Sequence, residues 1–173
     1  YKTFRALSWL NTDNDRCGFA GQIDGHLSFE DYVDYVLESP MIFINRNCET
    51  IPINGKISFN QFMEEGFQGF EADIDDFRLH ANLYFPEVRL RNFIEIRNHD
   101  CVGNDLQYSI LAIYKSILYS HSAIEEIEDL LKPFDYPDYS ELRYNVPKTA
   151  METRIGKYAV KDIAKEILYI SEK

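Results

Sequence analysis

The sequence is short of basic charge, and it has no long hydrophobic run. Its 173 residues carry 29 acidic and 18 basic side chains, for a formal net charge of -11. An acidic chain is repelled by nucleic acid and by anionic lipid, so we expect neither nucleic acid nor a membrane as a partner. The best apolar run, residues 110–119, is interrupted by Lys115 and is shorter than the roughly 18 residues of a membrane span. No signal segment follows Tyr1, and because Tyr1 is not methionine we expect a piece of a longer protein.

Cysteine, glycine and histidine do not occur in the patterns that bind metals or nucleotides. Cys17, Cys48 and Cys101 lie far apart without a CxxC pair, which is typical of reduced thiols, so we expect a cytoplasmic protein. The eight glycines form neither a P-loop with its lysine nor a dinucleotide-binding fingerprint. His80 and His99 have no partner at metal-binding spacing, so structural or solvent-facing positions are expected for both.

The residues that are present predict a folded domain. Hydrophobic residues make up 45% of the chain and aromatic residues 14%, which is enough to bury a core in spite of the acidity. The length fits a single domain, residues 1–173. Hydrophobic periodicity, capping boxes and prolines predict strands over residues 1–10, 41–45, 49–53 and 88–100. The same signals predict helices over residues 28–39, 59–67, 74–85, 106–119, 124–131, 139–144 and 153–171.

This order of elements predicts an α+β fold. Strands fall in residues 1–100, so we expect a partial antiparallel sheet there, packed with helices. Helices dominate residues 101–173, which should form a helical C-terminal portion.

The segment Val88–Asp100 carries the clearest chemical signal. Its alternation places Glu95 and Arg97 on one face of a strand, and Ile94 and Ile96 on the other, which should be the core face. A carboxylate and a guanidinium that point the same way can hold Mg²⁺ and a phosphate side by side, because Mg²⁺ prefers oxygen ligands and the arginine fork meets two phosphate oxygens. The alternative is an exposed ion pair on a solvated sheet face, and spacing alone leaves that alternative open.

Two further polar groups lie near the start of the chain. Asp13, Asp15 and Arg16 gather two carboxylates and a guanidinium, although Asn and Asp also favour turns, so a polar turn is the ordinary interpretation. Arg5, on the strand predicted for residues 1–10, suits either recognition of a carboxylate or a surface position.

Four segments, taken together and in order, resemble the C-terminal half of glutamate–cysteine ligase, in the group shared by plants and many bacteria. They are RxxxWxxTDNDRCG (Arg5 to Gly18), FEDYVDYVLESPM (Phe29 to Met41), FPEVRLRNFIEIR (Phe85 to Arg97) and NVPKT (Asn145 to Thr149). That family is related to glutamine synthetase, whose nucleotide site also carries an ExRxxD strand. The resemblance therefore implies a glutamine-synthetase-like catalytic fold, incomplete in this chain.

The resemblance also implies an ATP-dependent ligase of glutathione biosynthesis. With ATP and Mg²⁺ as cofactors, the γ-carboxylate of glutamate is phosphorylated, and the amine of cysteine then displaces phosphate to give γ-glutamylcysteine. By resemblance, Glu95 is the metal ligand and Arg97 is the catalytic residue that neutralises the transferring phosphoryl group. Arg5 resembles the arginine that holds glutamate, and Arg16 and Arg89 resemble arginines near the substrates.

Two positions depart from the family's pattern. Asn104 stands where an aromatic residue is usual, and Ile42 stands where tyrosine usually follows Pro-Met. These departures leave open a glutamate ligase that uses a different amine, and a non-catalytic interaction or regulatory module that retains the fold is a further alternative.

The family carries most of its metal-binding glutamates in an N-terminal half. We therefore expect this chain to be the C-terminal part of a larger ligase, with residues 1–100 as the sheet-containing active-site portion and residues 101–173 as the helical portion. The missing N-terminal half should be its partner, and the isolated chain should be inactive.

Overall fold

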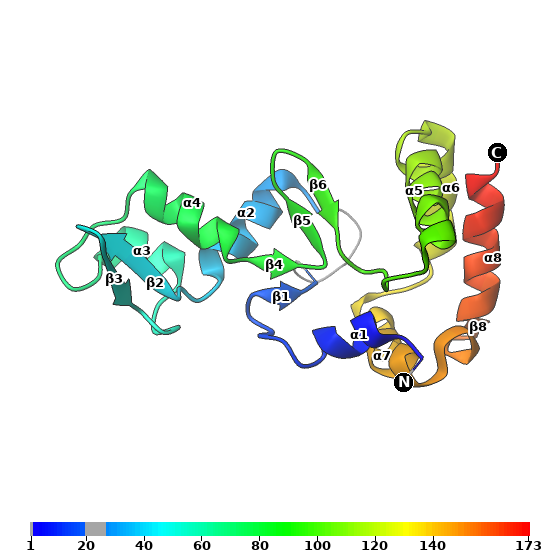
Figure 1. Ribbon diagram of the computed structural model, residues 1–173, viewed down its shortest axis with the longest axis horizontal. Coiled ribbons are helices and arrows are strands. Elements are labelled where there is room, and N and C mark those ends of the chain that lie inside the picture. Colours follow the sequence, from blue (N-terminus) through cyan, green and yellow to red (C-terminus); the bar gives the residue numbers. More distant parts are fainter. Residues whose placement is uncertain (1, 20–26) are drawn as a thin grey trace. The chain divides into compact units, whose positions relative to one another are not determined.

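The computed structural model describes residues 2–19 and 27–173, and the chain divides into two compact units (Figure 1). Unit 1 contains Tyr1–Asn11 and Asn98–Lys173, and unit 2 contains Thr12–Arg97. Both units combine helices with short strands, so the predicted α+β class is confirmed. In the described ranges the strands form two-stranded pairs instead of one larger sheet. The single-domain expectation for residues 1–173 stays a prediction.

One hairpin and one helix form the hydrophobic core of unit 2. Strand β2 (Phe43–Arg46) pairs antiparallel with β3 (Glu49–Pro52), close to the strands predicted over residues 41–45 and 49–53, and α3 (Phe59–Glu65) follows. Asn47 and Cys48 between the strands both have positive φ, the backbone conformation of a tight two-residue hairpin turn. The buried residues of this core are Met41, Ile44, Ile53, Phe59 and Phe62.

The start of α3 follows the predicted capping box and delivers two aromatic rings to that core. Ser58 Oγ accepts the Gln61 N–H, and Gln61 Oε1 accepts the Ser58 N–H. The ring of Phe59 packs edge-on against Phe62 and Phe77. Edge-to-face pairs of this kind favour one arrangement of the core over others.

Two longer helices complete unit 2. Helix α2 (Phe29–Glu38) begins at the predicted capping box of Ser28 and Asp31, and α4 (Ile74–Asn82) begins at a box headed by Asp73. Helix α4 ends three residues earlier than predicted, because the Leu83 N–H turns back to a carbonyl of the last turn and the chain enters a strand.

His80 on α4 is a buried structural residue. Its Nε2 lies 2.7 Å from the Val36 carbonyl oxygen and 3.0 Å from Ser39 Oγ, both at the end of α2. Its ring stacks on Phe59 at 5.2 Å. His80 therefore joins α2, α3 and α4, which confirms the structural role expected for it.

The chain after α4 contributes to two strand pairs. Strand β1 (Cys17–Gly18) pairs parallel with β4 (Phe85–Pro86), and β5 (Val88–Leu90) pairs antiparallel with β6 (Ile94–Ile96). The prediction of one continuous strand here is wrong, because residues 91–93 form a turn between β5 and β6. The predicted core face is also wrong, because the side chain at 94 is 61% exposed.

Unit 1 is mainly helical. Helices α5, α6 and α8 pack against one another, and α1 packs against α7 (Figure 1). Its elements are α1 (Phe4–Trp9), α5 (Asn104–Leu118), α6 (His121–Leu131), α7 (Tyr136–Thr149), a 3₁₀ turn (Ala150–Glu152), β7 (Arg154–Ile155), β8 (Tyr158–Ala159) and α8 (Val160–Ser171).

Three predictions for unit 1 are wrong. Residues 1–10 were expected to be extended, but α1 occupies Phe4–Trp9. The reason is that Ala, Leu and Arg favour a helix and that the helix buries Trp9. Tyr1 lies outside the described residues. The short helix predicted over residues 139–144 is longer, because α7 starts at a capping box headed by Asp135. The helix predicted over residues 153–171 is shorter, because Gly156, with φ +53°, makes the turn of the β7–β8 hairpin first.

Helices that could span a bilayer are not found in the described ranges, since none there is sufficiently long and apolar.

We predict that His80 makes the stability of the protein depend on pH. Burial, and to a lesser extent the charge of Arg16, lowers the pKa of His80 below its ordinary 6.5, so the unfolded chain takes up the proton more readily than the folded one. The free energy of unfolding should therefore fall as the pH drops below about 6.5. Urea titrations between pH 5 and 8 should give a flatter profile for His80→Gln; equal slopes for the two proteins would contradict the prediction.

Candidate functional site

The β5–β6 hairpin brings three of the predicted site residues together. Arg89 and Glu95 are directly opposite in the antiparallel register, and Arg89 Nε lies 2.9 Å from Glu95 Oε2. Arg97 Nη1 lies 3.7 Å from the same oxygen. The Arg89 side chain is 7% exposed, whereas Glu95 is 35% and Arg97 24% exposed. The contact of Glu95 with Arg97, which was expected from spacing, is thus longer than its contact with Arg89. One carboxylate therefore pairs with two guanidinium groups.

One aromatic ring lies beside both arginines. The guanidinium carbon of Arg89 is 5.0 Å from the centre of the Phe85 ring, and that of Arg97 is 5.3 Å from it. Both distances are within the range of a cation–π contact. The Arg97 N–H also donates to the Glu87 carbonyl oxygen at 2.9 Å, so backbone and side chain both hold Arg97 beside β4.

Helix α2 contributes a hydroxyl group to the hairpin. Tyr32 Oη accepts the Leu90 N–H at 3.1 Å, and its ring packs edge-on against Tyr84. Burial raises the pKa of Tyr32, so the hydroxyl stays protonated at neutral pH. The β5 strand is therefore fixed to α2 next to the Arg89–Glu95 pair.

Arg16 is occupied by contacts within the turn that precedes β1. Its Nη1 donates to the Pro40 carbonyl oxygen at 2.7 Å, and its Nη2 pairs with the carboxylate of Asp13. Asp13 also accepts the N–H of Asp15 and, through its carbonyl oxygen, that of Cys17. The ordinary interpretation of this segment, a polar turn, describes its geometry.

Arg5 belongs to unit 1 and lies on α1, so the strand expected for it is replaced by a helix. Its guanidinium carbon lies 5.8 Å from the centre of the Trp9 ring, and its backbone N–H donates to Asp100 Oδ1. Arg5 and Asp100 line a hollow of about 350 Å³. The lining residues are Phe4, Arg5, Ser8, His99, Asp100 and Cys101. A guanidinium and a carboxylate at one hollow offer partners for the two charged ends of an amino acid.

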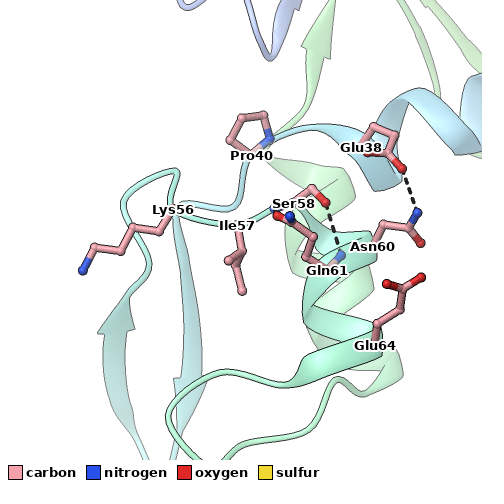
Figure 2. Close-up of a pocket in the computed structure, with 8 residues that line it drawn as sticks. All are labelled: Glu38, Pro40, Lys56, Ile57, Ser58, Asn60, Gln61 and Glu64. Carbon is pink, nitrogen blue, oxygen red and sulfur yellow. Dashed lines mark hydrogen bonds between the residues drawn. The ribbon is translucent and has the colours of Figure 1, made fainter.

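Unit 2 contains a separate, shallow hollow of about 300 Å³ beside α3, at the end of α2 (Figure 2). Asn60 Nδ2 donates to Glu38 Oε1 at its edge, at 2.7 Å. None of the predicted site residues lines it. Across residues 2–19 and 27–173, no three His, Cys, Asp or Glu side chains gather as a metal site.

Sequence reasoning missed two side chains of the site. Phe85 lies inside one of the segments that carry the family resemblance, so the segment was noticed and the ring's role was not. Tyr32 lay on the predicted helix as one of its apolar positions, and nothing in the sequence links its hydroxyl to Leu90. The contact of Tyr32 with Leu90 joins elements 58 residues apart in the sequence.

Comparison with known proteins supports the resemblance along the whole chain. The chain is 32% identical to glutamate–cysteine ligase A, chloroplastic, of Oryza sativa subsp. indica, over 99% of its own length and 36% of the relative. It is 28% identical to the chloroplastic glutamate–cysteine ligases of Nicotiana tabacum and Arabidopsis thaliana, over 100% and 99% of its length and 34% of each relative. The chain thus spans about a third of the length of the curated relatives it matches.

These relatives overturn one expectation. The cysteine pattern led us to expect a cytoplasmic protein, but the names of these relatives place them in the chloroplast, so that expectation is wrong. Scattered reduced thiols are equally compatible with an organelle, which is why the cysteine pattern did not separate the two compartments. The family model of glutamate-cysteine ligase family 2 (GCS2) matches residues 1–173, and the chain belongs to that family.

Proposed function

We propose that the protein is an ATP-dependent glutamate–cysteine ligase, of which this chain forms one wall of the active site. The observation that carries the proposal is the group of Arg89, Glu95 and Arg97 on the β5–β6 hairpin, in a chain of this family. The reaction joins the γ-carboxylate of glutamate to the amine of cysteine. ATP first phosphorylates the carboxylate, and the amine then displaces phosphate, so that the γ-amide, ADP and phosphate leave.

Arg97 has the geometry for the phosphoryl group in this proposal. Its guanidinium is partly exposed, and it contacts both the Glu95 carboxylate and the Phe85 ring. Phosphoryl transfer depends mainly on positioning and on neutralising charge, and a fixed guanidinium costs little reorganisation when that charge develops. Arg89 is too deeply buried to contact the phosphoryl group, so its proposed contribution is to hold Glu95 through their 2.9 Å ion pair.

Glu95 is the carboxylate that fits a magnesium ion in this part of the chain. It is a hard oxygen donor, and about a third of its side chain is exposed. A bound Mg²⁺ would neutralise phosphate charge next to Arg97. Because Glu95 already contacts two arginines, it would share its oxygens between them and the ion. A single carboxylate leaves most of the octahedral shell to water, phosphate and other glutamates, which supports a site completed by further protein.

The hollow that contains Arg5 and Asp100 is the proposed binding place for the amino-acid end of glutamate. Arg5 would pair with the α-carboxylate, and the Asp100 carboxylate would attract the α-ammonium group. Arg16 has its guanidinium occupied by Pro40 and Asp13, so its proposed contribution near the substrates is to hold the turn before β1.

A ligase that uses an amine other than cysteine is the second candidate. Two residues favour it, since Ile42 and Asn104 stand where the resemblance leads us to expect aromatic side chains near the acceptor. An aromatic side chain offers a large apolar contact surface, and its replacement changes the shape that an acceptor meets.

The direct test measures ADP release by the complete protein that contains this chain, with ATP, Mg²⁺, glutamate and a panel of amines. We expect release with cysteine and none with the isolated 173-residue chain, because one carboxylate does not clamp magnesium and triphosphate alone. Coupling only to other amines would favour the second candidate. Turnover by the isolated chain would contradict the proposed division of the site.

Replacing Arg97 with alanine should lower the turnover number of the complete protein by about 10²-fold or more, because the charge that neutralises the phosphoryl group is lost. Arg91→Ala is the matched control, since Arg91 lies on the same hairpin and its side chain donates to the exposed side chain of Asn82, while its backbone hydrogen bond to Phe93 is unaffected by the change. Steady-state kinetics on both variants measure the effect. Equal turnover in Arg97→Ala and the parent protein would favour a non-catalytic module.

Replacing Glu95 with glutamine should raise the Mg²⁺ concentration for half-maximal activity by roughly tenfold, because a neutral amide is a weaker ligand for a hard cation. Glu95→Asp keeps the carboxylate and should shift this concentration less. Glu49→Gln removes an exposed carboxylate from β3 and controls for net charge. Magnesium titrations at saturating ATP measure the shift, and identical curves for Glu95→Gln and Glu49→Gln would rule out Glu95 as a ligand.

A further inference from the structure

The hydroxyl group of Tyr32 joins helix α2 to the β5–β6 hairpin. The Leu90 N–H donates to Tyr32 Oη at 3.1 Å, although the two residues are 58 positions apart in the sequence. A two-stranded hairpin has little stability of its own, so its place in the protein depends on contacts from outside it. This hydrogen bond is such a contact.

The hydrogen-bond pattern of the hairpin explains why the Leu90 N–H needs an outside partner. In an antiparallel pair, alternate residues direct their backbone groups to the facing strand, and the residues between them direct theirs outward. The Arg91 N–H donates to the Phe93 carbonyl oxygen inside the hairpin. The N–H of the preceding residue, Leu90, therefore points to the outer edge of β5, where Tyr32 accepts it.

The ion pair of Arg89 and Glu95 lies between two fixed points of the backbone. Arg89 precedes Leu90 in β5 and is directly opposite Glu95, with 2.9 Å between Arg89 Nε and Glu95 Oε2. On the other side of this pair, the Arg97 N–H donates to the Glu87 carbonyl oxygen. A shift of β5 against α2 would move Arg89, and the carboxylate paired with it would move as well.

The ring of Tyr32 is itself held in place, so its hydroxyl is a fixed acceptor. It packs edge-on against the buried ring of Tyr84, with 5.9 Å between the ring centres. Burial raises the pKa of Tyr32, so the hydroxyl stays neutral. The charges of Arg89 and Glu95 also act on this pKa, in opposite directions, so the hydroxyl lies within electrostatic reach of both.

We propose that Tyr32 is a positioning residue of the ligase reaction, whose hydroxyl fixes β5 so that the Glu95 carboxylate is held where it meets magnesium. The inference rests on the proposed function, in which Glu95 is a metal ligand. It adds a residue of α2 that acts through the Arg89–Glu95 pair instead of touching the ion. Because one hydroxyl group makes the contact, it can be removed while the ring stays.

The test replaces Tyr32 with phenylalanine in the complete protein, which removes the acceptor of the Leu90 N–H. Mn²⁺ is the probe, because it takes the same oxygen ligands as Mg²⁺ and its free concentration can be measured by EPR. We expect the dissociation constant of Mn²⁺ in the presence of ADP to rise about fivefold, because groups that orient a metal ligand affect its affinity. The KM for glutamate should change less than about twofold, since the proposed glutamate hollow belongs to unit 1.

Tyr35→Phe is the matched control. Tyr35 lies one turn further along α2 and is also partly buried, and within residues 2–19 and 27–173 its hydroxyl makes no hydrogen bond to the hairpin. This variant should bind Mn²⁺ like the parent protein. A merely structural role of Tyr32 would lower the free energy of unfolding in urea and leave the Mn²⁺ affinity of the folded protein unchanged, and that result would overturn the inference.

A double variant tests whether Tyr32 acts through Glu95. If it does, Tyr32→Phe should weaken Mn²⁺ binding by less than about 1.5-fold in a protein that already carries Glu95→Gln, because the ligand that it positions is gone. The full effect of Tyr32→Phe in that background would show that the two residues act independently, which would contradict the proposed route.

The two proposals fail in different ways. If Glu95→Gln binds Mn²⁺ as tightly as Glu49→Gln, the metal role of Glu95 in the proposed function is wrong, and the inference falls with it. If Glu95→Gln weakens binding and Tyr32→Phe does not, the proposed function stands and the positioning role of Tyr32 is overturned. An equal loss of affinity in Tyr35→Phe and Tyr32→Phe would also overturn it.

Discussion

The candidate site depends on the pairing of the parallel strands β1 and β4, which two backbone hydrogen bonds hold together. They join the chain around Cys17 to the chain around Phe85, and the β5–β6 hairpin follows within two residues. A pair of strands this short closes a long loop and has little stability of its own. The core built on β2, β3 and α3 therefore has to hold the intervening chain in place. The positions of Arg89 and Arg97 therefore depend on apolar packing, although every residue that would do chemistry is polar.

The charges of the candidate site balance locally, so an acidic protein can still present a positive group to the anionic substrates of the proposed reaction. Burying Arg89 costs desolvation energy, and the opposite position of Glu95 in the strand register offsets it. The remaining positive charge belongs to Arg97, which is the more exposed of the two arginines. Seven of the nine arginines lie in residues 1–97, but that segment also carries 16 acidic side chains against nine basic ones and is net acidic like the whole chain, so the positive charge comes from the placement of individual arginines.

Local signals in the sequence predicted elements well, and non-local pairing was predicted poorly. The boxes at Ser28 and Ser58 located α2 and α3 because capping involves side chains three residues apart. The turn at residues 91–93 contains neither glycine nor proline, so nothing in the sequence divides β5 from β6. The predicted single strand kept Glu95 and Arg97 as neighbours and missed that Arg89 faces Glu95, since that contact exists only once the chain folds back. The family resemblance selected the residues used in the proposal without indicating their contacts.

The residues proposed for the reaction also bear on the part of the family's length that this chain does not span. Arg5 in unit 1 and Arg16, Arg89 and Arg97 in unit 2 carry positive charge, and Glu95 is the one carboxylate proposed for the metal. Triphosphate held by arginines alone would lack the carboxylates that fix magnesium and thereby orient the terminal phosphate. The curated relatives are about three times as long as this chain. On the proposed function, this chain would bind the anionic groups and position the transferring phosphate, while Glu95 together with carboxylates elsewhere in the ligase would hold the metal. In such an arrangement neither part gains activity by itself, because charge neutralisation and in-line positioning act on the same phosphoryl group.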